Sequence, residues 1–437
     1  MNLDSIYSSR HSKDASLKAQ RYFSGFKLAH DTYNAISAAS DGKIYYILSS
    51  DRFHKGGQMY VYDPETDEAA FLADLTEVCG EKDLKAISQG KSHVPFFEHS
   101  SHLYFATHVG FYEIIDGMER LPVNPPEGYQ LYPGGHILSY NLVTKEFREL
   151  ALAPHGEGII TMAMDTDRGH IYGITWPKGY FIHYNLEKDQ MNNLGLISHL
   201  GEAGIPGDDY RVLCRSMFVD HRDGLVYFST AEGNIYSYNP ASKVMENVAP
   251  ANLRLDYFGT YDPTQPGSMA YNWRKILWHT TDRMAYGVHG NSGYLFRFDP
   301  SRSDVEIVDR ITSEASRKSG MFDYYSYGYL GFDIGADGQT LYYLTGGPIY
   351  EDGQRVKAKK LAMGGARGLE NLHLITYHIA NRKYIDHGAI YYKDGTRPTY
   401  VNSIAVGPEG NIYTLARFEH NGRIIEDLVK IPDPFRS

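Results

Sequence analysis

The stretch Gly42-Lys43-Ile44-Tyr45 introduces a pattern that recurs along the whole chain: a turn residue, then an apolar residue followed by a tyrosine. Seven copies occur, and the tyrosines that end them are spaced by 55 to 71 residues. These tyrosines are Tyr45, Tyr104, Tyr172, Tyr227, Tyr286, Tyr342 and Tyr413. A period of this length is typical of propellers and solenoids, in which one repeat cannot bury its apolar face without its neighbours.

A second pattern follows each of the first six copies, as in Tyr60-Val61-Tyr62-Asp63-Pro64. Its alternation of side chains predicts a strand, and its Asp or Asn, often followed by Pro, predicts a turn. In the last repeat only residues 428–431 keep the strand pattern. We therefore predict an all-β fold, a seven-bladed β-propeller.

Seven blades of about four strands account for nearly all of the 437 residues, so we expect a single domain. The blades are predicted at residues 30–85, 86–155, 156–208, 209–266, 267–320, 321–396 and 397–431. Residues 1–20 are polar and free of the repeat, which favours a loose N-terminal arm.

A strand is expected at residues 22–28, ahead of the first full repeat. We predict that it pairs with the last blade near residues 428–431 and closes the ring, which would remove two exposed sheet edges. Two insertions, 113–134 and 348–368, interrupt the regular spacing. Loops of this length are often lids or binding loops, although a surface excursion is the alternative.

The formal charge of −10 argues against a nucleic-acid partner, because phosphate binding depends on clustered Lys and Arg. No apolar run approaches the ~20 residues that span a bilayer, and no secretory signal is recognisable, so no membrane partner is expected. The cytoplasm is the default location, or the periplasm or exterior if a leader has been removed. The two cysteines fall on different blades, which favours free thiols.

In a propeller, the starts of the inner strands and the loops between the second and third strands open on one face. The residues expected there are rich in His, Arg and aromatic side chains. Those predicted to bind substrate are Asn34, Lys91, Trp176, Tyr210, Arg211, Tyr271, Asn272, Trp273, His289, Tyr325 and Asn402. Aromatic rings stack on sugars and Arg grips carboxylates, so the predicted partner is an acidic oligo- or polysaccharide.

Three residues stand out among these positions. His93 and His108 occupy two mouth positions of the same blade. Arg215 lies within the apolar run 212–218, and a charge is rarely buried unless it is paired. We therefore expect Arg215 to point into the channel, with a buried structural ion pair as the alternative.

No Gly-x-Ser-x-Gly, His-Glu-x-x-His, phosphate-binding glycine loop or Cys-x-x-Cys occurs. The candidate metal ligands His279, His289, His373 and Cys214 lack local ligand spacing, so no metal site is assigned. No cofactor is expected to be required, and a structural divalent cation is left open, as is the oligomeric state.

Four stretches resemble a family of seven-bladed propeller polysaccharide lyases, such as ulvan lyases and L-rhamnose–D-glucuronate lyases. They are Lys91-Ser92-His93, Tyr104-Phe105-Ala106-Thr107-His108, Trp176-Pro177-Lys178-Gly179-Tyr180 and Cys214-Arg215-Ser216-Met217-Phe218-Val219-Asp220. The resemblance implies that His93, His108, Tyr180 and Arg215 are catalytic, with Tyr210 competing with Tyr180.

The reaction that the resemblance implies is β-elimination next to a uronic acid. Arg215 and a histidine would neutralise the carboxylate, while a tyrosine or histidine moves the protons. One alternative is a hydrolase or lactonase acting through a channel-bound divalent cation, with ligands drawn from Asp31, Asn34, Glu157, Asn272 and Asn402. Another is a non-catalytic propeller that binds a glycan or a protein.

Overall fold

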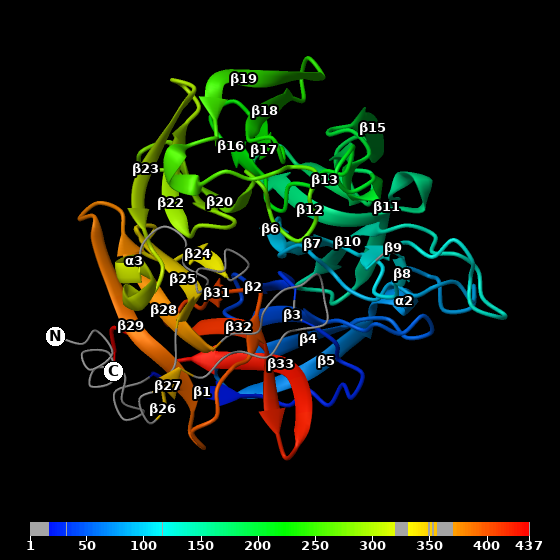
Figure 1. Ribbon diagram of the computed structural model, residues 1–437. Coiled ribbons are helices and arrows are strands. Elements are labelled where there is room, and N and C mark those ends of the chain that lie inside the picture. The colour runs from blue at the N-terminus through cyan, green and yellow to red at the C-terminus, as the bar shows by residue number, and fades with distance from the viewer. Residues whose placement is uncertain are drawn as a thin grey trace.

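The computed structural model describes residues 17–31, 33–115, 117–319, 331–347, 350–351, 354–355 and 370–436. These residues form an all-β protein with several four-stranded antiparallel sheets. Figure 1 shows the sheets following one another around the molecule in chain order. The arrangement is consistent with propeller blades.

Five sheets contain four strands each, and within each sheet the strand order follows the chain. The first contains β2 (Ile36–Ala38), β3 (Ile44–Leu48), β4 (Gln58–Asp63) and β5 (Glu68–Asp74). The second contains β6 (Phe97–His99), β7 (His102–Ala106), β10 (His136–Asn141) and β11 (Phe147–Leu152). The third contains β12 (Gly158–Asp165), β13 (His170–Trp176), β14 (Tyr180–Asn185) and β15 (Gln190–Leu196).

The fourth sheet contains β16 (Phe218–Asp220), β17 (Leu225–Ser229), β18 (Asn234–Asn239) and β19 (Val244–Asn252). The fifth contains β20 (Trp273–His279), β21 (Met284–His289), β22 (Tyr294–Asp299) and β23 (Asp304–Arg310). Nine of the other strands join into one sheet. In spatial order it contains β24 (Phe332–Ile334), β25 (Thr340–Gly347), β28 (Asn371–His378), β29 (Lys383–Tyr392), β1 (Leu17–Arg21), β33 (Arg423–Ile431), β32 (Ile412–His420) and β30 (Tyr400–Val401), with β31 (Ala405–Val406) also beside β32.

Strand β1 joins the two halves of the nine-stranded sheet. It runs parallel to β29 and antiparallel to β33, where Gln20 lies opposite Lys430. The predicted partner near residues 428–431 is therefore correct, but the strand occupies 17–21 rather than 22–28. The chain turns away after Tyr22, because the backbone N–H and hydroxyl of Ser24 both bond the Asp427 carboxylate.

The first strands of three four-stranded sheets, β2, β6 and β16, have only three residues each, whereas β12 spans the eight residues Gly158–Asp165. For β16 the reason is visible at Ser216, whose backbone carbonyl accepts a hydrogen bond from the Trp273 indole instead of joining the ladder. The residues that precede these strands are thus free to present side chains outside the sheets.

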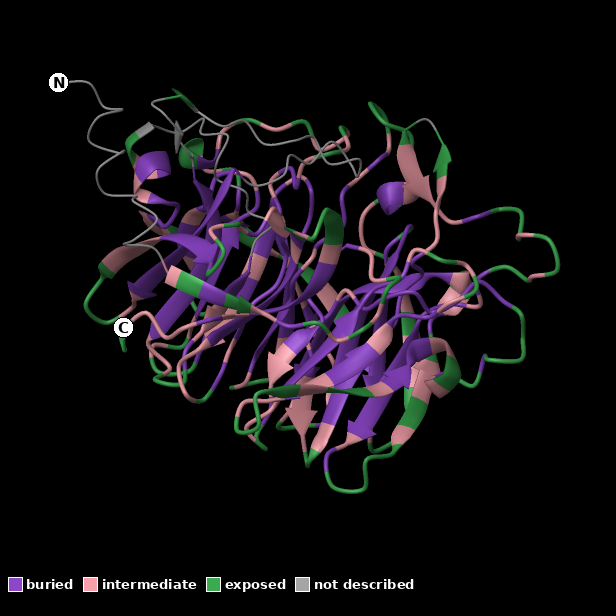
Figure 2. Cartoon of the chain, turned by 90° about the horizontal axis from the view of Figure 1, so that it is seen from below, coloured by how far each residue is buried: buried purple, intermediate pink, exposed green. Residues whose placement is uncertain are grey.

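The tyrosines of the repeated pattern are all buried, and several contact an aromatic ring of the adjacent sheet. Tyr45 lies 5.9 Å from Tyr140, and Tyr227 lies 5.5 Å from Phe298, both measured between ring centroids. Tyr413 of β32 lies 5.5 Å from Tyr62 of the first sheet. Figure 2 shows the buried residues running along the strands and the exposed residues gathered in the loops. The recurring tyrosine therefore packs one sheet against the next.

The insertion at 113–134 contains a hairpin of β8 (Glu113–Ile115) and β9 (Met118–Arg120). Of the insertion at 348–368, the described part forms β26 (Tyr350–Glu351) and β27 (Gln354–Arg355). Among the described residues, two short α-helices occur, α2 (Leu75–Val78) and α3 (Glu314–Ser319). Cys79 and Cys214 are buried free thiols, as predicted. Within the described ranges, no helix has the length and apolar character needed to cross a bilayer.

Candidate functional site

His93 and His108 lie in contact, with their ring centroids 4.6 Å apart. Their placement follows from an antiparallel bridge between Lys91 and His108, whose backbone N–H and carbonyl groups bond each other in both directions, at 3.1 and 2.7 Å. His93 follows Lys91 by two residues, so extended backbone directs both side chains to the same side. The segment before β6 and the end of β7 are thus joined where the two imidazoles meet.

His108 is a neutral imidazole, and one of its two ring nitrogens has no hydrogen-bond partner among the described residues. Its Nδ1–H donates to the Val109 carbonyl over 2.8 Å, while its Nε2 is buried and has no partner within the described part of the chain. Burial holds the pKa of His108 well below its usual value, and the charge of Lys91 lowers it further. The same two causes depress the pKa of His93. His108 therefore presents a ring nitrogen that can accept a proton.

Lys91 is a buried cation between two aromatic rings. Its side chain is 2% exposed, and its Nζ lies 3.9 Å from the centroid of Tyr33 and 4.5 Å from that of Tyr112. Burial lowers the pKa of Lys91 to about 8. Contact with ring faces stabilises such a charge in part, by about 2 kcal/mol or less for each ring.

Arg215 and Trp176 are both held by Glu202, which lies in a short turn over Gly201–Ala203. One carboxylate oxygen of Glu202 pairs with the Arg215 guanidinium and accepts the Leu213 N–H, and the other accepts the Trp176 indole N–H at 2.8 Å. Arg215 therefore forms the ion pair that was the alternative to a channel-facing cation. It also lies close enough to His93 and His108 for its charge to depress the pKa of both.

These groups form one assembly, which we call the central cluster. Tyr33 packs on His93 at 4.4 Å between ring centroids, and Trp176 packs on His108 at 5.3 Å. Its side chains come from the loop before β2, from both ends of the β6–β7 hairpin, from β13 and from the loop before β16. The members are Tyr33, Lys91, His93, His108, Tyr112, Trp176, Glu202 and Arg215.

The β8–β9 hairpin packs against the central cluster. The Arg120 guanidinium donates to the backbone carbonyls of Glu202 and Gly204. Burial raises the pKa of the neighbouring Glu119 carboxyl, and the charge of Lys91 opposes that rise. The insertion 113–134 was expected to act as a lid or a binding loop. It places Glu119 near Lys91, and Arg120 holds it to the backbone of Glu202 and Gly204.

Tyr180 does not join this assembly. It is the first residue of β14, and its ring lies 4.5 Å from that of His155. Tyr112 instead lies beside His108, with its hydroxyl 3.5 Å from Nδ1 and donating to the Val109 carbonyl at 3.1 Å. Tyr112 beside His108, like Tyr33 beside His93, was not selected by the resemblance, although Tyr112 lies only four residues beyond His108.

Asn272, Trp273 and His289 hold the fourth and fifth sheets together. Asn272 accepts from the Ser229 hydroxyl and donates to the Val212 carbonyl. Trp273 is fully buried and His289 stacks on Phe258 with 4.0 Å between centroids. Burial lowers the pKa of His289 to about 3, so it is a neutral core histidine. None of these contacts reaches the central cluster.

Three further predicted residues also serve local packing. Arg211 is paired with Glu232, and Tyr271 accepts a hydrogen bond from the backbone N–H of Tyr261. Tyr210 is buried in a small apolar group with Val212. Their side chains are therefore engaged in contacts among the loops that precede and follow strands of the fourth and fifth sheets.

Asn402 is buried and accepts a hydrogen bond from Arg274 at 2.8 Å. The charge of Arg274 contributes to the low pKa of His93, so the pair of Arg274 and Asn402 lies near enough to the central cluster to act on it electrostatically. No sequence signal marked Arg274, because the β20–β21 register shifts between Trp273 and Lys275 and simple strand alternation does not apply there. Asn34 is buried near Tyr33, and Tyr325 lies outside the described residues.

One grouping in the described ranges has ligand atoms close enough to hold a cation, namely Asp165, Asp167 and His221. Its atoms already bond protein groups: Asp165 accepts from Arg168, and His221 bonds Asp167. The cation ligands considered from the sequence are also engaged, since Glu157 accepts from Thr175 and Asn272 bonds two groups. No assignment of a metal follows from this geometry.

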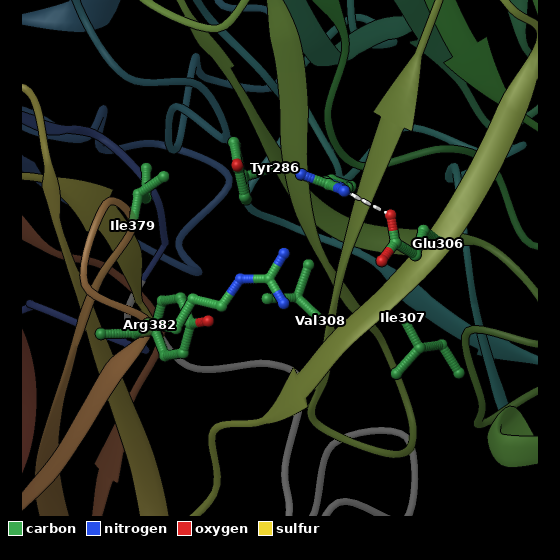
Figure 3. Close-up of a pocket in the computed structure, with 8 residues that line it drawn as sticks. Tyr286, Glu306, Ile307, Val308, Ile379 and Arg382 are labelled. Atoms are coloured by element: carbon green, nitrogen blue, oxygen red, sulfur yellow. Dashed lines mark hydrogen bonds and ion pairs between the residues drawn. The ribbon is translucent and has the colours of Figure 1, made fainter.

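A cavity of about 50 Å³ lies away from the central cluster, between the fifth sheet and β28 (Figure 3). An ion pair between Arg297 and Glu306 crosses its wall, and Arg382 projects toward it. Its charged groups are largely paired with each other or exposed, whereas the central cluster buries neutral histidines and a lysine. The buried histidines and lysine with shifted pKa values therefore lie in the central cluster and not at this cavity.

No protein-family model matches the sequence, and no curated protein matches it. Among solved structures, the chain is similar to the extracellular domain of BT4673, a proposed hybrid two component system of B. thetaiotaomicron. The TM-score is 0.50 at 13% sequence identity, over 95% of this chain and 40% of that one. The chain thus spans well under half of the length of the structure that it matches, and the likeness concerns the fold alone.

Proposed function

We propose that the sheets close into a seven-bladed propeller whose central cluster is the active site of a polysaccharide lyase. The substrate would be a glycan containing uronic acid, cleaved by β-elimination. The observation that carries the proposal is the Nε2 of a neutral His108, which is buried and has no hydrogen-bond partner among the described residues, set beside the cations Lys91 and Arg215. Removal of a proton next to a carboxylate requires a base and positive charge together.

Ring closure is supported by contacts between the first and last parts of the chain. Tyr413 of β32 packs on Tyr62 of the first sheet, and Leu428 of β33 is buried in the same apolar group as Ile44. The pairing of β1 with β33 supports the same topology. A closed ring would bring the loop before β2 next to the loops of the second, third and fourth sheets, where the central cluster lies.

The proposed reaction conserves protons. The Nε2 of His108 takes the C5 proton of the uronate, the C5–H electron pair becomes the C4=C5 double bond, and the C4–O4 bond breaks with its electrons on O4. The Tyr112 hydroxyl protonates O4, because burial raises its pKa and keeps it protonated. The imidazolium returns a proton from Nδ1 to Tyr112 across 3.5 Å, and exchange with solvent restores the His108 tautomer.

We give the acid role to Tyr112 rather than Tyr180 because the Tyr180 ring packs on His155. His93 and Trp176 would flank the sugar ring, and Arg215 would be held in position by Glu202. No step in this scheme uses a metal.

The second candidate, already considered from the sequence, is a propeller that recognises a glycan without cleaving it. The buried state of His108 and Trp176, at 1% and 4% exposure, is compatible with this candidate as well. The same fold serves both roles, so the choice depends on chemistry.

The test is incubation with ulvan, gum arabic, pectin and glycosaminoglycans, with and without EDTA. The lyase proposal expects the ultraviolet absorbance of a conjugated C4=C5 uronate, unaffected by EDTA, and its loss in His108→Gln but not in His102→Gln. Binding of an acidic glycan without this absorbance would favour the recognition candidate. Loss of activity in EDTA would instead support the hydrolase or lactonase considered from the sequence.

A further inference from the structure

We propose that Lys91 is the group that receives the carboxylate of the sugar, and that Arg215 is a positioning residue. This inference rests on the proposed function in taking a uronate as the ligand. It assigns specificity to one cation of the cluster: the site should select a free carboxylate and reject its ester.

The first step is the state of Lys91. Its side chain is 2% exposed, and its Nζ faces the rings of Tyr33 and Tyr112. No carboxylate of the described ranges lies within ion-pair distance of it. A buried charge without a counter-ion is costly, and an anionic ligand would relieve that cost.

The second step concerns the carboxylates around Lys91. The negative charges of Glu119 and Asp31 act on Lys91 without contacting it. Asp31 lies 3.7 Å from the Arg417 guanidinium, so part of its charge is already balanced. Glu119 belongs to the β9 strand of the inserted hairpin, which is fastened by Arg120. Neither the Glu119 nor the Asp31 carboxylate therefore forms an ion pair with the Lys91 ammonium.

The third step is the state of Arg215. Glu202 neutralises its charge, and Arg215 also donates to the Leu213 carbonyl at 3.0 Å. A guanidinium that already has a buried carboxylate partner gains less from a second one. Lys91 is therefore left as the cation whose charge is not balanced by a direct contact.

The environment of Lys91 also defines the kind of ligand. Two tyrosine rings face the ammonium, and His93 packs on one of them, Tyr33; this environment suits the apolar face of a sugar next to a single carboxylate. An ammonium is a point charge and does not select the planar, bidentate geometry that Arg favours. We expect the site to accept D-glucuronate and comparable uronates and to discriminate by charge.

The experiment measures calorimetric binding of methyl D-glucuronide and of its methyl ester to the full chain. The unmodified protein should bind the acid more tightly than the ester by roughly 10- to 100-fold, as expected for a charged hydrogen bond. Lys91→Met should remove that preference, Lys91→Arg should restore part of it, and the exposed Lys188→Met should leave it unchanged.

Folding is checked in the same samples by the melting temperature, which should hold or rise in Lys91→Met because a buried charge is removed. If Lys91→Met keeps the full preference for the acid, or if the unmodified protein shows no preference, the inference is overturned. If the preference depends on Lys91 but no unsaturated product forms from any glycan, the inference stands and the lyase proposal fails.

Discussion

Two buried histidines of the second sheet and its loops, His108 and His136, have opposite electrostatic states. They belong to neighbouring segments, since the backbone N–H of Thr107 bonds the carbonyl of His136 at 2.9 Å. His136 has Glu81 at 2.6 Å from Nε2 and Glu149 at 2.9 Å from Nδ1. His108 has a backbone carbonyl on one nitrogen and nothing on the other within the described residues.

The difference shows that hydrogen-bonding and charged partners, and not burial alone, decide whether a buried histidine is protonated. Burial depresses the pKa of both imidazoles, but the two glutamates outweigh burial at His136 and raise its pKa. An imidazole between two carboxylates keeps its protons and fixes the structure. An imidazole beside Lys91 without a carboxylate stays neutral and can act as a base.

The largest expected effect comes from removing the base. His108→Gln should lower kcat by roughly 10²- to 10⁴-fold, the usual contribution of a general base. The melting temperature should change little, because Nε2 of His108 makes no hydrogen bond that would be lost. Initial rates and thermal unfolding measured together test this, and a variant with unaltered kcat would exclude His108 as the base.

Removing the other histidine should affect stability and not catalysis. His136→Leu leaves Glu81, which is 4% exposed, without its cationic partner. Breaking a buried pair in this way costs about 3 kcal/mol or more of unfolding free energy. Chemical denaturation measures the loss, with the more exposed His102→Leu as a control. A His136 variant as stable as the parent would show that the two glutamates need no cation.

The smallest effect is the pH dependence of stability, where the two histidines should have opposite signs. The folded pKa of His136 is raised, so its contribution is complete below the unfolded value of about 6.5 and is lost as pH rises through the folded value. The folded pKa of His108 is lowered, so its folded state is penalised as pH falls below about 6.5. Unfolding free energies of the parent and each variant across this range should separate the slopes, and parallel curves would contradict the assignment.

The sequence was sufficient to predict the sheets because their cause is local and repeated. The recurring tyrosine and the turn residues before it act within one hairpin, and several of the tyrosines contact an aromatic ring of the next sheet. The partner of the N-terminal strand was also predictable, but its bounds were not. The shift to 17–21 depends on Ser24 bonding Asp427, a contact between distant parts of the chain.

The candidate site was predictable only in part. His93, His108 and Lys91 were identified because a strand end and a loop of one hairpin bring them together. Glu202 and Tyr33 were missed because they lie in loops without a repeating pattern, where only tertiary packing gives a residue its role. Trp273 and Asn272 were assigned to binding, although their side chains face the joint between two sheets. Arg274 could not be predicted from alternation along β20, because the register shifts between Trp273 and Lys275.

The position of β1 between β29 and β33 has a consequence for how the molecule is made. The strand emerges from the ribosome several hundred residues before both of its partners. Its backbone donors must stay solvated, or be shielded by other proteins, until the far end of the chain arrives. Pairing over such a separation is slow, so assembly of the final sheet should be a late event in folding.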